Sequence, residues 1–435
     1  MKAGLLAGRL ALATSYFRTR MLAALLSSRE RIDCWQTNRI ENLRRHAIAN
    51  TDFYRRLGDI PFKAFPVVEK SMMMAQFEAF NMLGLTASDG WQQFEIGQSP
   101  PGYDLGCSTG TSGNRGLYLV SDRERFVWLG TIVAKALPDV LRRRHRVAVI
   151  LPRASRLYDA ANESRLLKLR FFELTAGLHV IAEQISGFQP TVVVGPPKAL
   201  RWMAQNGIAI TPERMFSGGE VLDSVDRTVI EHSFNLKLGQ IYMATEGLFG
   251  VSCEYGVVHL AEDAVHFEFE PVGDRLVSPT VTDFTRRTQV MACYRMNDLL
   301  RLADKPCRCG SAFLAVEEIV GRRDDCFELP PRGTVGKAIT VTPDIPRNAV
   351  LDADRRIDDF RVLQTGSNAV DLVLNSNLPD DAANAAKQSL TSALLKLGAA
   401  PDITLRREPL PVDITAKLRR VEQRWRPHAG GELPN

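Results

Sequence analysis

The chain has 435 residues, of which 45% are hydrophobic and 24% charged, and its formal net charge is +5. This length exceeds what one hydrophobic core usually serves, so we expect at least two domains, and the composition excludes a wholly disordered protein. The small net charge permits an anionic ligand such as a nucleotide but does not favour nucleic acid as a partner.

The first segment is rich in leucine, but Arg9, Arg18 and Arg20 interrupt it. No run therefore approaches the roughly 20 apolar residues that a membrane-spanning helix needs. No convincing small-residue cleavage site follows, as a signal peptide would require. We expect an amphipathic helix lying on the body of the protein, no membrane span, and a cytoplasmic location.

Apolar residues at helical spacing predict helices over about 28–56, 70–80 and 122–137. Short apolar strands then alternate with helical segments, and the strands fall near 147–151, 191–194, 208–216 and 238–242. This alternation predicts an α/β fold with a mostly parallel sheet covered by helices. Ligands of such sheets bind beyond the carboxyl ends of the strands. Beyond residue 325, strands near 360–363 and 370–374 and a helix near 379–397 predict a smaller α+β domain.

A loop rich in glycine and hydroxyl residues precedes an apolar run at 117–120, and it contains Ser108, Thr109, Gly110, Thr111, Ser112 and Gly113. Glycines allow a backbone to curl, and hydroxyls and amide groups can then surround a phosphate. The loop is not a Walker A motif, because the Gly-Lys-Ser/Thr ending is absent. A flexible surface loop is the alternative interpretation.

Four more short motifs follow in order: Ser217-Gly218-Gly219-Glu220, Tyr242 to Gly247, Tyr294 to Asp298, and Gly321 to Asp325. With the loop, they resemble the adenylate-forming (acyl-adenylate synthetase) superfamily. The branch that they resemble is the phenylacetate–CoA ligase group, including relatives that adenylylate a deazaflavin coenzyme. The resemblance extends from Phe53 to Lys417 and implies a large N-terminal domain, 1–323, and a small mobile C-terminal domain, 324–435.

The resemblance also implies roles for catalytic residues. The loop Ser108 to Gly113 would hold the β- and γ-phosphates of ATP, although the usual lysine near its end is replaced by Arg115 and Gly116. Glu246 would bind Mg²⁺, and Thr245 would hold a phosphate oxygen. A helix-capping role is the alternative for Glu246.

Lys417 is the candidate for the mobile lysine that neutralises the adenylation transition state. The glycine that usually flanks this lysine is missing, and Arg419 and Arg420 are competing candidates.

The nucleoside would be bound by the remaining motifs. Ser217, Gly218, Gly219 and Glu220 match the turn beside adenine, and Tyr242 would stack near the base. Asp298 would accept hydrogen bonds from the ribose hydroxyls, although Asn297 stands before it where glycine is usual. Arg322 would contact the ribose or a phosphate, and Asp324 would lie at the hinge.

Seven cysteines occur without an export signal, which favours thiols or metal ligands over disulfides. Cys253, His259, Cys307 and Cys309 form a set of the type that binds structural zinc. Packed thiols with a hydrogen-bonded histidine are the alternative. Members of this ligase branch carry a zinc cluster in this region, which supports the zinc interpretation.

The predicted activity is therefore activation of a carboxylic acid, aromatic by resemblance, with ATP and Mg²⁺, followed by transfer to a thiol such as coenzyme A. The alternatives are a nucleotidyltransferase that modifies a phenolic hydroxyl, an amide-forming ligase, and an inactive nucleotide-binding protein. The expected partners are the small acid and the acyl acceptor, and a homodimer is left open.

Overall fold

The computed structural model describes residues 2–108, 115–151, 166–273, 275–333, 336–411 and 417–425, with side chains from residue 7 onward. The chain forms two compact units. The large unit comprises Met1–Met296 and Leu300–Glu318, and the small unit comprises Asn297–Leu299 and Ile319–Asn435. The boundary between them therefore runs through two neighbouring strands, β13 (Asp298–Leu302) and β14 (Ala315–Arg322).

The large unit begins with helices: α1 (Lys2–Leu25), α2 (Arg29–Asn50), α3 (Asp52–Arg56), η1 (Phe62–Ala64), α4 (Lys70–Ala75), α5 (Phe77–Phe80) and α6 (Ala87–Glu95). The hydroxyl of Ser28 accepts a hydrogen bond from the backbone N–H of Arg31, and so defines where α2 begins. The single helix expected over 28–56 is divided at Thr51, whose backbone is extended.

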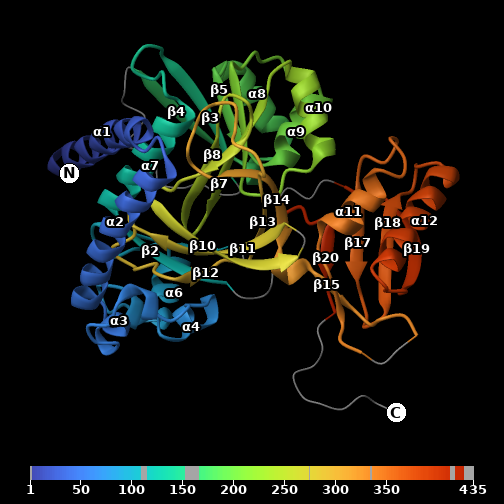
Figure 1. The fold of residues 1–435 in the computed structure, drawn as a ribbon. Coiled ribbons are helices and arrows are strands. Elements are labelled where there is room, and N and C mark those ends of the chain that lie inside the picture. Colours follow the sequence, from blue (N-terminus) through green and yellow to red (C-terminus); the bar gives the residue numbers. More distant parts are fainter. Residues whose placement is uncertain are drawn as a thin grey trace. The chain divides into compact units, whose positions relative to one another are not determined.

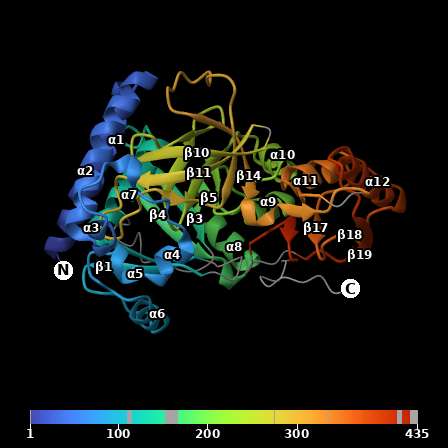
Figure 2. The ribbon, with the colours of Figure 1, turned by 60° about the horizontal axis from the view of Figure 1, so that its bottom comes forward.

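A two-stranded antiparallel sheet carries the predicted phosphate loop. Its strands are β1 (Tyr103–Cys107) and β2 (Leu117–Ser121), and they are followed by α7 (Asp122–Ala136). A capping box joins Ser121 and Glu124 at the start of α7, because each side chain bonds to the backbone of the other. Helix α1 lies along α7 (Figures 1 and 2).

The large sheet has a parallel half in the order β4-β3-β5-β6-β7. These strands are β3 (His145–Leu151), β4 (Leu167–Glu173), β5 (Val192–Gly195), β6 (Arg214–Gly218) and β7 (Leu238–Ala244), with helices η3 (Leu174–Ala176), α8 (Leu178–Phe188), α9 (Pro197–Gln205) and α10 (Ser224–Phe234) between them. The continuous apolar character of β5 suits a strand buried on both faces. The predicted α/β class is confirmed.

The other half of the sheet is antiparallel and was not predicted. Its remaining strands are β8 (Gly247–Ser252), β9 (Val258–Leu260), β10 (Val265–Gly273), β11 (Leu276–Asp283) and β12 (Tyr294–Arg295). The order is β10-β11-β13-β14-β9-β8-β7, with β12 paired to β11 (Figure 1). Strand β7 therefore belongs to both halves, and the Thr245–Glu246 turn follows it directly.

The small unit has an α+β core. A four-stranded sheet in the order β19-β18-β17-β20 packs with α12 (Asp380–Lys396) around Phe360, Leu372 and Leu390. Its other elements are η4 (Arg323–Asp325), β15 (Phe327–Leu329), β16 (Ile339–Val341), α11 (Asp344–Leu351), β17 (Phe360–Gln364), β18 (Ala369–Asn375), β19 (Asp402–Glu408) and β20 (Val421–Gln423). Among the described helices of either unit, none combines the length and the apolarity needed to cross a bilayer.

Candidate functional site

The two ends of the predicted phosphate loop are held together in the large unit. Cys107 and Leu117 are paired across β1 and β2. The backbone N–H of Ser108 donates to the Gly116 carbonyl at 2.8 Å, and the Gly116 N–H donates to Ser108 Oγ at 2.8 Å. Thr109, Gly110, Thr111, Ser112 and Gly113 lie outside the described residues.

A lysine from a distant segment lies at the base of this loop. Lys70, the first residue of α4, donates a hydrogen bond from Nζ to Ser108 Oγ at 3.0 Å. A Cβ atom on Gly116 would lie 2.6 Å from Lys70 Cε, so a larger residue there would require the flexible end of the lysine side chain to shift. Arg115, which replaces the usual sequence near the loop end, lies over the Trp91 ring instead, at 5.8 Å.

Thr245 and Glu246 form the two-residue turn of the β7–β8 hairpin, because Ala244 and Gly247 are paired partners. Thr245 Oγ1 donates to Glu246 Oε2 at 2.8 Å, and the Tyr294 hydroxyl donates to Glu246 Oε1 at 3.2 Å. Two hydroxyl groups therefore orient this carboxylate. Glu246 lies between two strands, so it is not a helix cap.

Arg286 supports this turn from inside the protein and is 0% exposed. Its Nη1 donates to the Thr245 carbonyl at 3.3 Å, and its Nη2 donates to Gln289 Oε1 at 2.9 Å. Burial lowers the pKa of Arg286, while the carboxylates of Glu124 and Asp283, followed by that of Glu246, act to raise it. The cation is therefore balanced by several carboxylates rather than by one ion pair.

The pKa values of two of these carboxyl groups, Asp283 and Glu124, are shifted in opposite directions. Burial raises the pKa of Asp283 to about 6, although it accepts hydrogen bonds from the Thr285 N–H and hydroxyl. Burial also acts to raise the pKa of Glu124, but Arg286 and the groups of Thr288 outweigh it and lower that pKa. A Cβ at Gly247 would meet Asp283 Oδ2 at 2.6 Å, which explains the glycine after Glu246.

Lys70, the end of the predicted phosphate loop and the Thr245–Glu246 turn border one cleft of the large unit. Its lining includes Lys70, Met73, Gly116, Tyr118, Thr245, Glu246, Arg286, Gln289, Met291 and Tyr294. The cleft is thus bordered by the ammonium group of Lys70, by the end of the predicted phosphate loop and by the Glu246 carboxylate. Two hydroxyl groups orient this carboxylate. A carboxylate with hydroxyl neighbours supplies the hard oxygen ligands that Mg²⁺ prefers, so the donor set fits this ion. Lys70 and Arg286 could not be predicted from the sequence, since neither lies in a recognisable motif.

The predicted adenine-side turn follows β6. Ser217 is buried at the end of this strand, and Gly219 has φ of +82° at the turn. Glu220 forms an ion pair with Lys198 at 3.1 Å, and both side chains are only 5% exposed. Tyr242 is also buried, and its ring centroid lies 5.3 Å from that of Phe249.

The residues predicted to bind ribose belong to the small unit. Asp298 begins β13, and Arg322 ends β14. Asn297 Nδ2 donates to Asp324 Oδ2 at 2.7 Å, and the Asp324 N–H donates to Asn297 Oδ1 at 3.2 Å. The side chain of Asn297, which stands where glycine is usual, therefore links the motif at 294–298 to the motif at 321–325.

Lys417 also lies in the small unit, half-buried and just before β20. Its two competitors are engaged by carboxylates of the same unit. Arg419 forms ion pairs with Asp325 and Glu422. Arg420 Nε lies 3.0 Å from Asp359 Oδ1. Arg419 and Arg420 are thus paired with carboxylates of the small unit.

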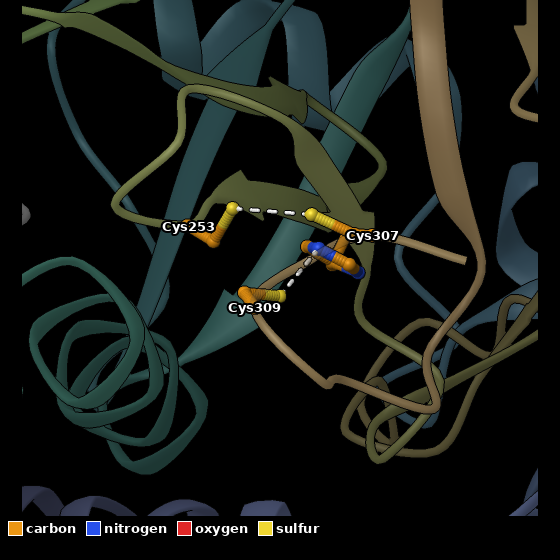
Figure 3. A group of neighbouring side chains, drawn as sticks. Cys253, Cys307 and Cys309 are labelled. Atoms are coloured by element: carbon orange, nitrogen blue, oxygen red, sulfur yellow. Dashed lines mark hydrogen bonds between the residues drawn. The ribbon is translucent and has the colours of Figure 1, made fainter. Parts of the chain in front are cut away.

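The four predicted zinc ligands converge in the large unit, and their ligand atoms all lie within 4.8 Å of one another (Figure 3). The sulfur atoms of Cys253 and Cys307 are 3.8 Å apart, and Cys309 Sγ is 3.2 Å from His259 Nε2. With zinc–sulfur bonds of about 2.3 Å, a tetrahedral site places two sulfurs roughly 3.8 Å apart. The donor set and its spacing fit a zinc ion.

Two similar turns present the cysteines. The Gly256 N–H donates to the Cys253 carbonyl at 2.9 Å, and the Gly310 N–H donates to the Cys307 carbonyl at 3.1 Å. Both glycines have positive φ, +76° and +78°. His259 Nδ1 lies 3.0 Å from the Phe313 carbonyl, and a donated Nδ1–H there leaves Nε2 as the ligand atom.

The fold is shared with solved structures of adenylate-forming ligases. A 2-hydroxyisobutyryl-CoA ligase in the postadenylation state, in complex with R3-HIB-AMP, aligns with a TM-score of 0.70 and 15% identity, over 91% of this chain and 90% of that one. Fatty acyl-adenylate ligases from E. coli and L. pneumophila align with a TM-score of 0.50 and 14% identity, over 73% and 67%. Similarity at this identity establishes a shared fold.

One curated protein also matches in sequence. Protein CapK of Staphylococcus aureus is 24% identical over 161 residues, which are 35% of this chain. The match spans 36% of the length of CapK, about a third of it. No family model matches the sequence.

We expect the purified protein to contain close to one equivalent of zinc, because four suitable ligand atoms already converge. Cys307→Ser should lose the metal and lower the melting temperature, since the β8–β9 turn would lose its link to the loop before β14. Elemental analysis and calorimetry measure both effects. Cys34→Ser, which removes an exposed thiol, is the matched control. Wild-type protein free of zinc after purification without chelators would contradict the assignment.

Proposed function

We propose that the chain is an ATP-dependent adenylate-forming ligase. It would convert a carboxylic acid into an acyl adenylate and then transfer the acyl group to a thiol, with coenzyme A as the first candidate. The observation that supports this most is the single cleft bordered by Glu246, Thr245, Lys70 and the end of the phosphate loop. The fold shared with acyl-CoA and acyl-adenylate ligases supports the same conclusion.

In the first half-reaction, the substrate carboxylate is already ionised at neutral pH and needs no general base. Its oxygen forms a bond to the α-phosphorus of ATP, and the bond from that phosphorus to the pyrophosphate oxygen breaks. Catalysis then depends on positioning and charge. Glu246 would hold Mg²⁺, which would neutralise phosphate charge when bound. The hydroxyls of Thr245 and Tyr294 fix the orientation of this carboxylate beforehand.

Lys70 would bind the phosphates that become pyrophosphate. Its ammonium group lies at the base of the loop that is proposed to enclose them. An ammonium group is a compact point charge that suits a phosphate oxygen. Lys70 therefore takes over the role of the lysine that is missing from the end of the loop.

Three further residues would supply the ribose contacts and the second cation. Asp298 would accept hydrogen bonds from the ribose hydroxyls, with Arg322 beside it, and Lys417 would neutralise charge on the α-phosphate. Ser217, Gly218, Gly219 and Glu220 would border the adenine, and Tyr242 would stack near the base.

In the second half-reaction, the thiol loses its proton to solvent and its sulfur forms a bond to the acyl carbon, and AMP leaves with the electrons of the carbon–oxygen bond. An aromatic acid and the phenylacetate–CoA ligase branch are the substrate and subgroup that we propose, on the basis of the sequence motifs. A relationship to enzymes that adenylylate a deazaflavin coenzyme belongs to the same proposal. A zinc ion bound by the four-ligand cluster would be structural, because no ligand position is left for substrate.

Acid-dependent exchange of labelled pyrophosphate into ATP, measured over a panel of acids, tests the function. We expect Glu246→Gln to lower this exchange by about 10² or more, because a preorganised charge interaction in the transition state is lost. Glu78→Gln, an exposed substitution of the same type, should have no effect. Wild-type protein that exchanges with no acid, or forms a stable AMP adduct of a phenol by mass analysis, would contradict the ligase proposal.

We expect Lys70→Ala to lower kcat/KM for ATP by about tenfold to a hundredfold, the range for a lost hydrogen bond to a charged group. Steady-state exchange at varied ATP concentration measures it. Lys63→Ala, an exposed lysine seven residues earlier, is the control. An unchanged kcat/KM for ATP in Lys70→Ala would remove this residue from the phosphate site.

We expect Lys417→Ala to slow adenylation by roughly 10² or more, since it removes a cation from the transition state. Thiol transfer from a supplied acyl adenylate should remain largely intact. The two half-reactions are measured separately in single-turnover experiments. Equal losses in both would reject the specific role of Lys417 in adenylation, and Arg419→Ala serves as the neighbouring comparison.

A further inference from the structure

Helix α1 carries a row of exposed apolar side chains, which we call the outer stripe: Leu10, Phe17, Met21 and Leu25. They are 68%, 57%, 54% and 51% exposed. At about 100° per residue, their spacing places all four within an arc of roughly 80° on the helix. Among the described residues, the only other large apolar side chains more than half exposed are Ile96 and Leu141, on separate segments. Four of the six described large apolar side chains that are more than half exposed therefore lie on α1.

Packing on the opposite side fixes the orientation of α1. Ser15 Oγ donates to the Val127 carbonyl of α7 at 2.8 Å. A Cβ atom on Gly130 of α7 would lie 2.4 Å from the Leu12 carbonyl oxygen, so the two backbones are in close contact. In both ribbon views, α1 lies at the outer edge of the large unit (Figures 1 and 2). Rotation of α1 to bury the outer stripe would break these contacts.

The charges on α1 are all of one sign. The helix contains Lys2, Arg9, Arg18 and Arg20 and no acidic residue, and the first acidic residue of the chain is Glu30. At 100° per residue, the exposed Arg9 and Arg20 lie roughly 100–120° from the centre of the outer stripe on one side, and the half-buried Arg18 lies roughly 60° from it on the other.

A further cationic group lies beside α1. Burial lowers the pKa of Arg39 in α2, and the guanidinium groups of Arg18 and Arg287 lower it further. The guanidinium groups of Arg18, Arg39 and Arg287, which come from three segments of the chain, therefore lie near one another. An exposed apolar stripe flanked by basic residues suits the surface of an anionic membrane.

We propose that α1 docks the protein on the surface of an anionic lipid bilayer. The outer stripe enters the boundary between headgroups and acyl chains, and the flanking arginines contact the anionic headgroups. The helix lies parallel to the membrane plane and does not cross it, in keeping with the hydropathy of the described helices. This proposal is independent of the reaction that the cleft performs.

The charges on α1 favour a bilayer over a second copy of the chain as the partner that covers the outer stripe. Two copies paired through the outer stripe would place like-charged flanks together, and α1 has no carboxylate to compensate them. An anionic surface complements the stripe and both flanks at once. We therefore assign the surface to lipid.

Co-sedimentation of the full chain with vesicles tests the proposal. Vesicles of phosphatidylcholine with about 30% phosphatidylglycerol provide the anionic surface, and pure phosphatidylcholine is the comparison. We expect binding to the anionic vesicles that weakens with added salt. Leu10→Ser/Phe17→Ser/Met21→Ser should reduce the partition coefficient at least tenfold. Ile96→Ser/Leu141→Ser, which removes equally exposed apolar groups elsewhere, should bind like wild type.

Two further variants separate the contributions of the basic and the apolar side chains to vesicle binding. Arg9→Gln/Arg20→Gln should lower binding to anionic vesicles and flatten its dependence on salt. Phe17→Ser alone gives the same test if the triple variant has a lowered melting temperature. Wild-type protein that does not sediment with anionic vesicles, or stripe variants that bind as wild type does, would overturn the proposal. A dimer that is lost in the stripe variant, without vesicle binding, would assign the surface to a second copy instead.

Discussion

The arrangement of the candidate site depends on the fully buried guanidinium group of Arg286. Arg286 contacts the backbone of the Thr245–Glu246 turn, and its charge is opposed by Glu124, Asp283 and Glu246. An uncompensated buried cation would cost several kcal/mol, so these carboxylates and the cation must be placed as a group. Arg286 follows the antiparallel strand β11, whereas Glu246 follows β7, which the two halves of the sheet share. The orientation of the proposed Mg²⁺ ligand therefore depends on both halves of the sheet.

Features encoded in consecutive residues could be predicted from the sequence. The apolar run of β5 indicates a buried parallel strand, and Thr245 and Glu246 are adjacent in a recognisable motif. Even there, the turn type was not predicted, since nothing local shows that β8 returns antiparallel to β7. Strands such as β10 mix buried and exposed residues, so their pairing depends on distant partners.

Lys70 and Arg286 could not be predicted because their importance arises only from tertiary packing. Lys70 lies 38 residues before the serine that it contacts, in a short helix without any motif. Arg286 sits in a segment whose neighbouring arginine, Arg287, looks equivalent in the sequence. One of the two is fully buried and the other half-buried, and only the fold distinguishes them. By contrast, the residue types of Cys253, His259, Cys307 and Cys309 were enough to predict that they converge.

Gly116 and Lys70 compete for the same volume. Because a single added carbon at position 116 would overlap Lys70 Cε, a larger residue at the loop end disfavours the present position of the Lys70 side chain. The two positions should therefore vary together among homologues, with a cation on one side and a small residue on the other. A search that requires a basic residue at the end of this loop would discard chains in which the same charge is delivered by a helix located well upstream.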